Sequence, residues 1–305
     1  MEAPPQRVGD VLNAATARLS VAGSETARLD AEVLLAHVLG VDRSILAAHP
    51  EAVLSTGQLA GYESHVARRE AGEPVAYIRG VKEFYGTAIS VDRRVLIPRP
   101  ETEALVELAL VRIAADLSRA PRDRSDPYLV WDVGTGSGAI GVAIGNELRR
   151  RRYGDAVRFF ASDISSDARD VATINVVSQG LAHLFIFAEG DLLDVVPAPP
   201  RPADLLLANL PYIRTGTIPT LAVAASYEPT IALDGGPDGL AVIRRLLDGL
   251  PGVLATGGAA LLEIGDEQAG SMTKAAAELL PGWTCTIHAD LSGNPRVAQI
   301  EISDD

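Results

Sequence analysis

The sequence predicts an α/β fold: a doubly wound, mostly parallel sheet that ends in an antiparallel hairpin and is preceded by a small all-helical domain. From Tyr128 onward, short apolar runs typical of buried strands alternate with stretches of helical periodicity. Such alternation is typical of a parallel sheet covered by helices on both faces. Before residue 80, in contrast, apolar residues recur only at helical spacing.

Composition limits the classes of function. The chain has 305 residues, 47% of them hydrophobic, and a net charge of −13, which disfavours non-specific binding to nucleic acid or to an anionic membrane. Cys285 is the single cysteine, which excludes a disulfide framework and a thiolate zinc cluster. Apolar runs stay shorter than a membrane span, and Met1–Pro5 lacks the layout of a signal peptide. We therefore expect a cytoplasmic protein that does not contact membranes.

Residues 1–80 are expected to form the helical domain. A second helix is predicted with Ser24 as its N-cap and Gly40 just past its end, and a third from Ser55 or Thr56 to Gly72. The spacing of the histidines does not suit a metal site, and we predict none. The pattern is compatible with a cap, a dimerisation element or a partner-docking module. Apolar positions of the first two helices are Val8, Val11, Leu12, Ala15, Leu19, Leu29, Val33, Leu34 and Leu35.

Residues 81–100 are expected to form a β-hairpin linker with Gly86 near its bend, and residues 101–305 the α/β domain. A helix is expected to begin near Thr102. The strands and helices that follow are predicted from their periodicity. Strands are expected at 128–131, 157–162, 184–188, 203–208, 258–264, 283–288 and 296–302, and helices at 139–150, 166–178, 237–250 and 267–280.

A glycine-rich turn follows the first strand of this domain, in the segment D-V-G-T-G-S-G at 132–138. Glycine lets the chain turn sharply and lets a ligand approach the backbone, and the N–H groups of the next helix then face that ligand. The turn therefore predicts a nucleotide-type pocket. The alternative is a tight strand–helix joint without a ligand.

Two acidic strand ends follow along the chain. Because ligands of open parallel sheets bind at the carboxyl ends of the strands, Asp163 is a candidate acceptor for ribose hydroxyls. Its alternative role is to cap the helix from Ser166. Asp191 is a candidate acceptor for the amine of a base, with Leu192 against the ring, or else a plain turn residue.

A fourth strand end carries Asn209, Leu210, Pro211 and Tyr212. Asn209 offers a side-chain carbonyl, Pro211 stiffens the backbone so that nearby main-chain carbonyls point in a set direction, and Tyr212 offers an aromatic face. These groups predict a clamp for a planar –NH2 group. The alternative is an ordinary Asn-Pro-type turn.

These motifs resemble those of class I S-adenosylmethionine-dependent methyltransferases, and more specifically the HemK-type protein-(glutamine-N5) methyltransferases that modify peptide chain release factors. The resemblance covers nearly the whole chain and includes E-F-Y-G at 83–86, L-I-P-R-P-E-T-E at 96–103, Y-E-P-T-I-A-L at 227–233, G-G-P-D-G-L at 235–240 and D-L-S-G-N-P-R-V at 290–297.

The resemblance implies a Rossmann-like methyltransferase sheet, S-adenosylmethionine as cofactor and a release factor as protein substrate. The substrate amide would lie against residues 209–212. Asp191 joins the cofactor site by the reasoning above. The cofactor contacts that the resemblance implies are Gly134, Thr135, Gly136, Ser137, Gly138, Asp163, Leu192 and Asn209.

One position departs from the family pattern. The family has Asn-Pro-Pro-Tyr, whereas Leu210 gives Asn-Leu-Pro-Tyr, a form similar to that of ribosomal RNA adenine dimethyltransferases. Adenine-N6 methylation and small-molecule methylation are therefore alternatives, although the acidic charge and the lack of a basic RNA module disfavour the first. A non-catalytic cofactor-binding protein and an NAD enzyme are further alternatives, and the clamp argues against both.

Overall fold

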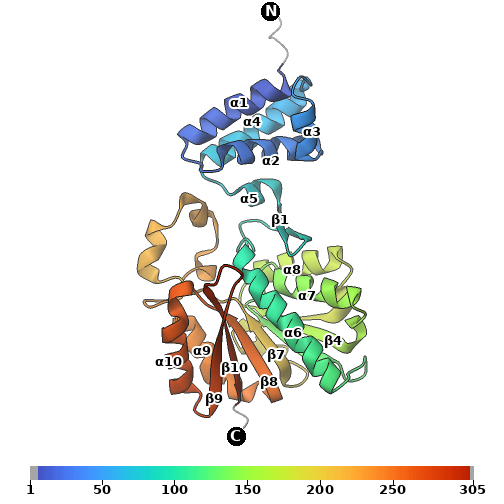
Figure 1. Ribbon diagram of the computed structural model, residues 1–305, viewed down its shortest axis with the longest axis vertical. Helices are drawn as coiled ribbons and strands as arrows, with labels where there is room; N and C mark the ends of the chain where they lie inside the picture. The colour runs from blue at the N-terminus through green and yellow to red at the C-terminus, as the bar shows by residue number, and fades with distance from the viewer. Residues whose placement is uncertain (1–5, 303–305) are drawn as a thin grey trace, which may run out of the picture. The chain divides into compact units, whose positions relative to one another are not determined.

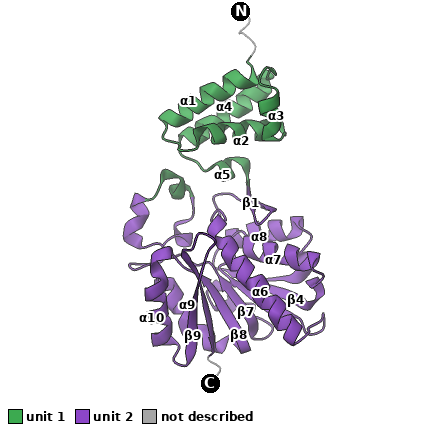
Figure 2. Cartoon of the chain, viewed as in Figure 1, with its two compact units in different colours: residues 1–81, 221–227 green, residues 82–220, 228–305 purple. Residues whose placement is uncertain are grey.

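The computed structural model describes residues 6–302 (Figure 1), so residues 1–5, which carry our expectation about a signal peptide, lie outside the described part. The chain divides into two compact units, coloured separately in Figure 2. The first unit contains the residues up to 81 together with 221–227, and the second contains 82–220 and 228–305.

The first unit is built from helices that share one apolar core. α1, α2 and α4 pack against one another, and their buried residues include Leu12, Leu34 and Tyr62. Ser55 caps α4 through a capping box with Gln58, as the polar residues before the helix suggested. The helices are α1 (Val8–Val21), α2 (Ala27–Leu39), α3 (Arg43–Ala48), α4 (Thr56–Glu70) and α5 (Val75–Arg79).

Two details of α2 correct the sequence prediction. The residue before the helix is Thr26 and not Ser24, whose hydroxyl instead donates to Asp30 Oδ2 at 2.8 Å. Leu29 is 45% exposed, so it does not belong to the buried face. Gly40 does end the helix, in the left-handed conformation that glycine favours.

Residues 221–227 belong to the first unit although they come late in the chain. The hydroxyl of Tyr227 donates to the main-chain oxygen of Ala71 at 2.9 Å. Gly72 has a φ of +93°, and a Cβ atom there would lie 2.6 Å from Val223 Cγ1. Only glycine therefore allows this close approach.

The second unit is a mixed eight-stranded sheet with helices on both faces (Figure 1). The strand order is β6-β5-β4-β3-β7-β8-β10-β9, with β4, β5, β3, β7 and β8 parallel and β6, β9 and β10 antiparallel to their neighbours. The strands are β3 (Tyr128–Val133), β4 (Val157–Asp163), β5 (Phe185–Asp191), β6 (Asp194–Val196), β7 (Ala203–Ala208), β8 (Leu254–Glu263), β9 (Trp283–Ala289) and β10 (Pro295–Ile302).

This topology confirms the predicted fold class and its terminal hairpin. The chain passes from β3 outward through β4 and β5 and then returns to β7 on the other side of β3. The reversal between β3 and β7 is the switch point at which such sheets bind ligands. The short strand β6 was not predicted. The helices are α6 (Glu103–Arg119), α7 (Ala139–Arg150), α8 (Ser166–Ser178), α9 (Ala241–Gly249) and α10 (Ala269–Leu279).

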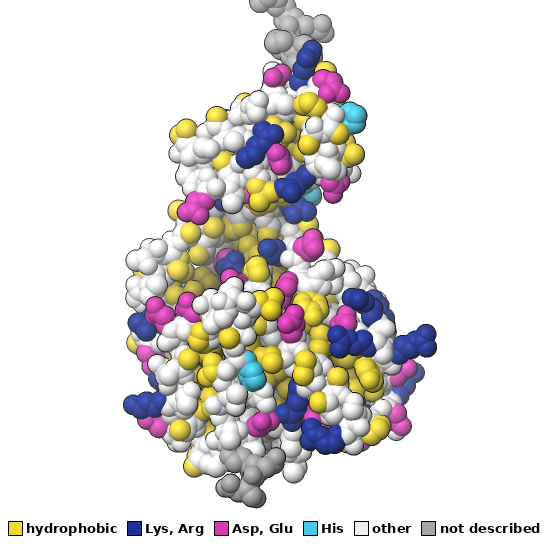
Figure 3. Space-filling model, viewed as in Figure 1, with side chains coloured by type: hydrophobic (Ala, Val, Ile, Leu, Met, Phe, Trp, Pro, Cys, Tyr) yellow, Lys and Arg dark blue, Asp and Glu magenta, His cyan; other side chains and the backbone are white. Residues whose placement is uncertain are grey.

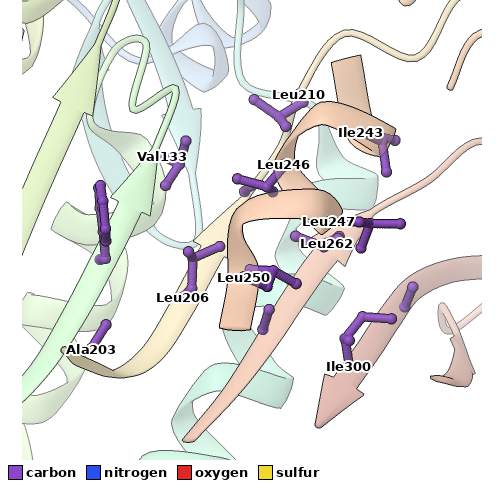
Figure 4. Close-up of a cluster of buried hydrophobic side chains, with 14 of the residues drawn as sticks. Val133, Ala203, Leu206, Leu210, Ile243, Leu246, Leu247, Leu250, Leu262 and Ile300 are labelled. Atoms are coloured by element: carbon purple, nitrogen blue, oxygen red, sulfur yellow. The ribbon is translucent and has the colours of Figure 1, made fainter. Parts of the chain in front are cut away.

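One hydrophobic core of this unit lies between the sheet and the layer of α9 and α10. Figure 4 shows its α9 side chains above the strands. Leu206 on β7 and Leu262 on β8 pack there with Leu246 of α9. Leu210, just beyond β7, belongs to the same cluster. The core thus extends up to the end of the sheet where the polar residues gather.

The hairpin is shorter than expected. It consists of β1 (Val81–Phe84) and β2 (Thr87–Ser90), with Gly86 at the bend. Residues 91–99 form no strand, although Val95 and Ile97 are buried. Because Pro98 and Pro100 cannot donate hydrogen bonds to a neighbouring strand, the segment runs to a 3-10 turn (Pro100–Thr102) before α6 instead.

Candidate active site

A cavity of about 560 Å³ lies at the carboxyl end of the parallel strands, which is a volume typical of small-ligand sites. The turns after β3, β4, β5 and β7 all contribute to its wall. The structure thereby brings together most residues that the sequence predicted for the site. Among the predicted residues, those that line the cavity are Gly134, Thr135, Gly136, Ser137, Asp163, Asp191, Leu192, Asn209, Leu210 and Pro211.

The three glycines of the turn after β3 are all in the left-handed region, with φ of 69°, 55° and 75° at Gly134, Gly136 and Gly138. Gly138 is not part of the cavity wall. A Cβ atom there would lie 3.2 Å from the Cβ of Ala172 on α8, so Gly138 is needed for close helix packing. A Cβ atom at Gly136 would contact only the Gly134 oxygen, at 3.9 Å, so the backbone at Gly136 is not crowded by other side chains.

The side chain of Asp132 stabilises the glycine-rich turn after β3. It is fully buried, and its Oδ2 accepts a hydrogen bond from the Thr135 hydroxyl at 2.7 Å. Burial raises the pKa of Asp132 to about 6. Its other oxygen, Oδ1, has no hydrogen-bond partner within the described residues. Asp132 therefore fixes the conformation of the turn and does not itself face the cavity.

Asp163 connects the ends of β3 and β4. Its Oδ2 accepts from the Gly136 N–H and its Oδ1 from the Ser165 N–H, both at 2.9 Å. The Gly136 N–H is therefore already bonded within the protein. The alternative role of Asp163 as a helix cap is wrong, because Ser165 caps α8 by accepting from the N–H of Ala168. Burial raises the pKa of the Asp163 carboxyl.

Asn175 is a buried residue of α8 that the sequence analysis missed. Its side-chain nitrogen donates to the main-chain oxygens of Ser137 and Ser90, and its Oδ1 accepts from the Ser90 N–H at 2.7 Å. It therefore links the glycine-rich turn to the hairpin. A single asparagine within an amphipathic helix gives no signal of this role in the sequence.

Asp191 and Leu192 form the part of the wall after β5. The Oδ2 of Asp191 pairs with a terminal nitrogen of Arg245 on α9 at 2.7 Å, and both side chains are about half exposed. Arg245 also lines the cavity, and the sequence analysis did not select it because a helical arginine usually faces solvent. Leu192 has a φ of 57°, which turns the chain at this point.

Asn209 follows β7, and its amide is held by a specific partner. Its Nδ2 donates to the hydroxyl oxygen of Thr102 at 3.0 Å, and Thr102 also lines the cavity. No described residue donates to its Oδ1 or to the main-chain carbonyl of Leu210. Two acceptors at the cavity wall are therefore available to an incoming N–H group.

Tyr212 lies behind this segment and is not among the residues that line the cavity. Its hydroxyl donates to Glu263 Oε1 at 3.3 Å, and its main-chain oxygen accepts from Gln268 at 3.0 Å. Burial raises the pKa of the Tyr212 hydroxyl. Tyr212 thus anchors the segment, which differs from the aromatic face that the sequence predicted.

An ion pair joins two further segments of the wall, with Glu228 buried and the Arg99 side chain 37% exposed. Glu228 accepts from Arg99 at 2.6 Å and from the N–H of Ile97 at 3.3 Å. Pro98 and Pro229, next to these residues, both line the cavity. The pair joins the L-I-P-R-P and Y-E-P-T segments, which lie far apart in sequence. Glu101 is exposed.

Two further classes of site are absent from residues 6–302. No cluster of three or more His, Cys, Asp or Glu side chains there has a metal-binding arrangement. None of the helices in this range combines the length and apolar character that a membrane span requires.

Comparisons with known proteins identify the family. Residues 10–80 match a family model described as the PrmC N-terminal domain. The chain is 39% identical to the release factor glutamine methyltransferase of Moorella thermoacetica over 84% of this chain and 85% of that protein. It is also 39% identical to that of Rhodopirellula baltica, over 92% of this chain and 90% of that protein.

Similarity to a solved structure supports the fold alone. The hMettl16 catalytic domain, solved with MAT2A 3′UTR hairpin 6, has a TM-score of 0.52 and 14% identity, covering 84% of this chain and 86% of that chain. The assignment to a family rests on the relatives found by sequence. With such identity over most of its length, the chain belongs to the release factor glutamine methyltransferase family.

Proposed function

We propose that this protein transfers a methyl group from S-adenosylmethionine to the side-chain amide nitrogen (N5) of a glutamine in a peptide chain release factor. The observation that carries the proposal is the fixed amide of Asn209 at the cavity wall, next to the unused carbonyl of Leu210. The –NH2 group that receives the methyl group has two hydrogens, and each of these two oxygens can accept a hydrogen bond from one of them.

The chemistry of the acceptor explains why such a site suffices. An amide nitrogen is a poor nucleophile because its lone pair is delocalised into the carbonyl. Positioning at near-attack distance therefore contributes much of the rate. Hydrogen bonds from both N–H groups to Asn209 and Leu210 also favour the pyramidal nitrogen of the transition state. No strong base is needed, since the proton can leave after methyl transfer.

The other half of the cavity fits S-adenosylmethionine, which supplies an electrophilic methyl group when bound. Because other side chains do not crowd Gly136, a ligand can approach its backbone. Each oxygen of Asp163 already accepts from a main-chain N–H, of Gly136 or Ser165. We infer that ribose hydroxyls donate to the remaining lone pairs of this carboxylate. We infer that Leu192 packs on the base and that Asp191, at the cavity wall, accepts from the amine of the base.

We further propose that the helical unit docks the release factor. The match of residues 10–80 to the PrmC N-terminal domain supports a conserved module in this position. The test is to delete residues 1–80 and compare two substrates, a full-length release factor and a short peptide with the same glutamine. We expect methylation of the full-length factor to fall and that of the peptide to persist. An unchanged rate on the full-length factor would contradict docking.

Charge supports a protein substrate over nucleic acid. On the face shown in Figure 3, acidic and basic side chains are interspersed on both units and do not form one basic track. A net charge of −13 has the same implication. A reaction on a release factor also implies that the protein acts in the cytoplasm, where translation occurs.

The experiment is to incubate the protein with S-adenosylmethionine carrying a labelled methyl group and, separately, with a purified release factor, RNA and a small-molecule extract. We expect label on one glutamine of the release factor, located by mass spectrometry. The Asn209→Ala variant is the control for contaminating activity. Label on adenine in RNA, with none on the release factor, would replace this proposal by adenine-N6 methylation.

A further inference from the structure

Among residues 6–302, two of those that line the cavity carry a positive charge, Arg94 and Arg245. Arg245 pairs with Asp191 at the turn after β5. Arg94 lies in the segment between β2 and the 3-10 turn before α6, where the backbone forms neither helix nor strand. The proposed reaction gives this second cation no role so far, although a charged side chain at a cavity wall is well placed to bind a ligand.

Asp92 holds the Arg94 side chain in a fixed position. Its Oδ1 accepts from the main-chain N–H of Arg94 at 3.0 Å and from Nε at 2.9 Å, and its Oδ2 accepts from Nη2 at 2.7 Å. Val91 and Val95, on either side, are each 2% exposed and fix this turn to the interior. The guanidinium is therefore oriented before a ligand arrives, which lowers the entropic cost of binding.

One edge of the Arg94 guanidinium is still available. A guanidinium can bind a carboxylate along an edge, through two parallel N–H···O bonds. Asp92 occupies the edge formed by Nε and Nη2. No residue of the described part of the chain accepts from Nη1. The edge formed by Nη1 and the second hydrogen of Nη2 can therefore bind another carboxylate.

The order of the strands indicates where such a carboxylate would lie. Across the sheet the strands follow one another as β5, β4, β3 and β7. The contacts proposed above for the base, the ribose and the substrate amide are Asp191 after β5, Asp163 after β4 and Asn209 after β7. In S-adenosylmethionine the sulfur follows the ribose and carries both the methyl group and the amino-acid tail. We therefore expect the tail at the glycine-rich turn after β3.

The N–H groups of this turn are largely engaged within the protein. Thr135 donates to the main-chain oxygen of Ser162 at 2.9 Å, and Gly138 donates to that of Thr135 at 2.8 Å. The Gly136 N–H donates to Asp163 at 2.9 Å. A carboxylate taken out of water is unfavourable without hydrogen-bond partners, so the tail requires a partner from another segment.

Asn175 links the segment that contains Arg94 to this turn. Its Nδ2 donates to the main-chain oxygen of Ser137 in the turn and to that of Ser90, four residues before Arg94, both at 2.9 Å. Arg94 and the turn residue Gly136 line the same cavity. The free edge of the guanidinium is therefore available on the part of the wall where the tail is expected.

We propose that Arg94 binds the carboxylate of the methionine tail of S-adenosylmethionine through the free edge of its guanidinium, and that Asp92 is a positioning residue for Arg94. The inference rests on the proposed use of S-adenosylmethionine as methyl donor. Because the carboxylate and the reacting methyl group lie on different branches from sulfur, Arg94 contributes to affinity for the methyl donor and not to the methyl-transfer step.

The test is calorimetry with two ligands, S-adenosylmethionine and its decarboxylated form, which keeps the base, ribose, sulfonium and amine. Arg94→Gln should weaken binding of S-adenosylmethionine by about 10- to 100-fold, because it removes a charged hydrogen-bond partner. The same variant should bind the decarboxylated ligand within about twofold of the wild type. Arg94→Lys should give an intermediate loss, because lysine keeps the charge but has no edge that binds both oxygens.

Arg93→Gln is the matched control, because Arg93 is exposed and does not line the cavity. Its affinity for both ligands should equal that of the wild type. Asp92→Asn should weaken binding of S-adenosylmethionine less than Arg94→Gln does, since the charge of Arg94 remains and only its orientation is lost. At saturating S-adenosylmethionine, kcat of Arg94→Gln should stay within about threefold of the wild type, while KM for this ligand rises.

The outcomes separate this inference from its rivals. Equal weakening of both ligands in Arg94→Gln would overturn it, because the carboxylate would then not be what Arg94 recognises. Unchanged affinity for S-adenosylmethionine with a higher KM for the release factor would also overturn it, and would assign Arg94 to an acidic group of the protein substrate. A wild type that binds neither ligand would refute the proposed function itself, whereas tight binding to both the wild type and Arg94→Gln would refute only the role of Arg94.

Discussion

The side-chain nitrogen of Asn209 donates to the hydroxyl of Thr102 at 3.0 Å, although 107 residues separate the two in sequence. This bond joins the start of α6 to the end of β7 and uses one face of the Asn209 amide. The opposite face is the one that we propose for the substrate amide. The P-R-P-E-T-E block therefore contributes to the proposed substrate site, because its threonine holds the asparagine.

Asn209→Ala should reduce methyl transfer by about 10²- to 10³-fold, because it removes one preorganised hydrogen-bond acceptor. Asn209→Asp should bind the donor well but turn over poorly, because its negative charge stabilises the sulfonium more than the transition state in which that charge is being lost. Single-turnover rates and calorimetry with the donor measure the two effects. A wild-type rate in Asn209→Ala would refute the clamp.

Asp163→Ala should weaken S-adenosylmethionine binding by about 1–3 kcal/mol, since it removes the hydrogen bonds that we propose from the ribose. The variant also loses the bond from Gly136, so melting temperature should be recorded alongside affinity. Asp167→Ala, at an exposed site in the first turn of α8, is the control for a nearby lost charge. Calorimetry checks the prediction, which fails if both variants bind equally or if NAD binds tightly in place of the donor.

Leu210→Pro should give activity on a release factor that equals or exceeds that of the wild type, because it restores the family's proline. Leu210 is 5% exposed and packs in the core of Figure 4, so the smaller ring should also cost about 1–3 kcal/mol of stability. Leu210→Ala is the matched control, since it loses the packing without gaining the ring. Lower release-factor activity in the proline variant than in the alanine variant would instead mark Leu210 as a determinant of another substrate.

Asp132→Asn should change the pH dependence of stability. The pKa of Asp132 in the folded state, about 6, lies above its ordinary value of 3.8. Its contribution to stability is therefore fully present below about pH 4 and is lost as the pH rises through about 6. The asparagine cannot ionise. The free energy of unfolding of the variant, relative to that of the wild type, should therefore rise by about 3 kcal/mol as the pH goes from below about 4 to above about 6.

Urea unfolding of both proteins at pH 4, 6 and 8 measures this difference. Burial also raises the pKa of Glu263, so this residue adds a pH dependence of the same sign to the stability of both proteins. The comparison between Asp132→Asn and the wild type isolates Asp132. A constant difference in the free energy of unfolding across this pH range would contradict the assignment.

The sequence by itself determined the fold class and the strand ends that form one part of the cavity wall. Strands and helices differ in the period of their apolar residues, so the alternation of strands and helices from Tyr128 onward can be seen in the sequence. This alternation predicts a parallel sheet, in which the carboxyl ends of the strands meet at one edge. Glycines and acidic residues placed at those ends can therefore be assigned to a site without coordinates. The terminal hairpin is predictable for the same reason, since two strand periods follow without a helix.

The tertiary structure alone decided which side chains support the site. Thr102, Asn175 and Glu263 look like ordinary helix and strand residues in the sequence, and Tyr212 looks like a ligand contact. Their roles depend on which distant segments pack together, and local periodicity carries no information about such contacts. Only packing placed Thr102 against Asn209, turned Tyr212 toward Glu263 and buried that carboxylate beside the site.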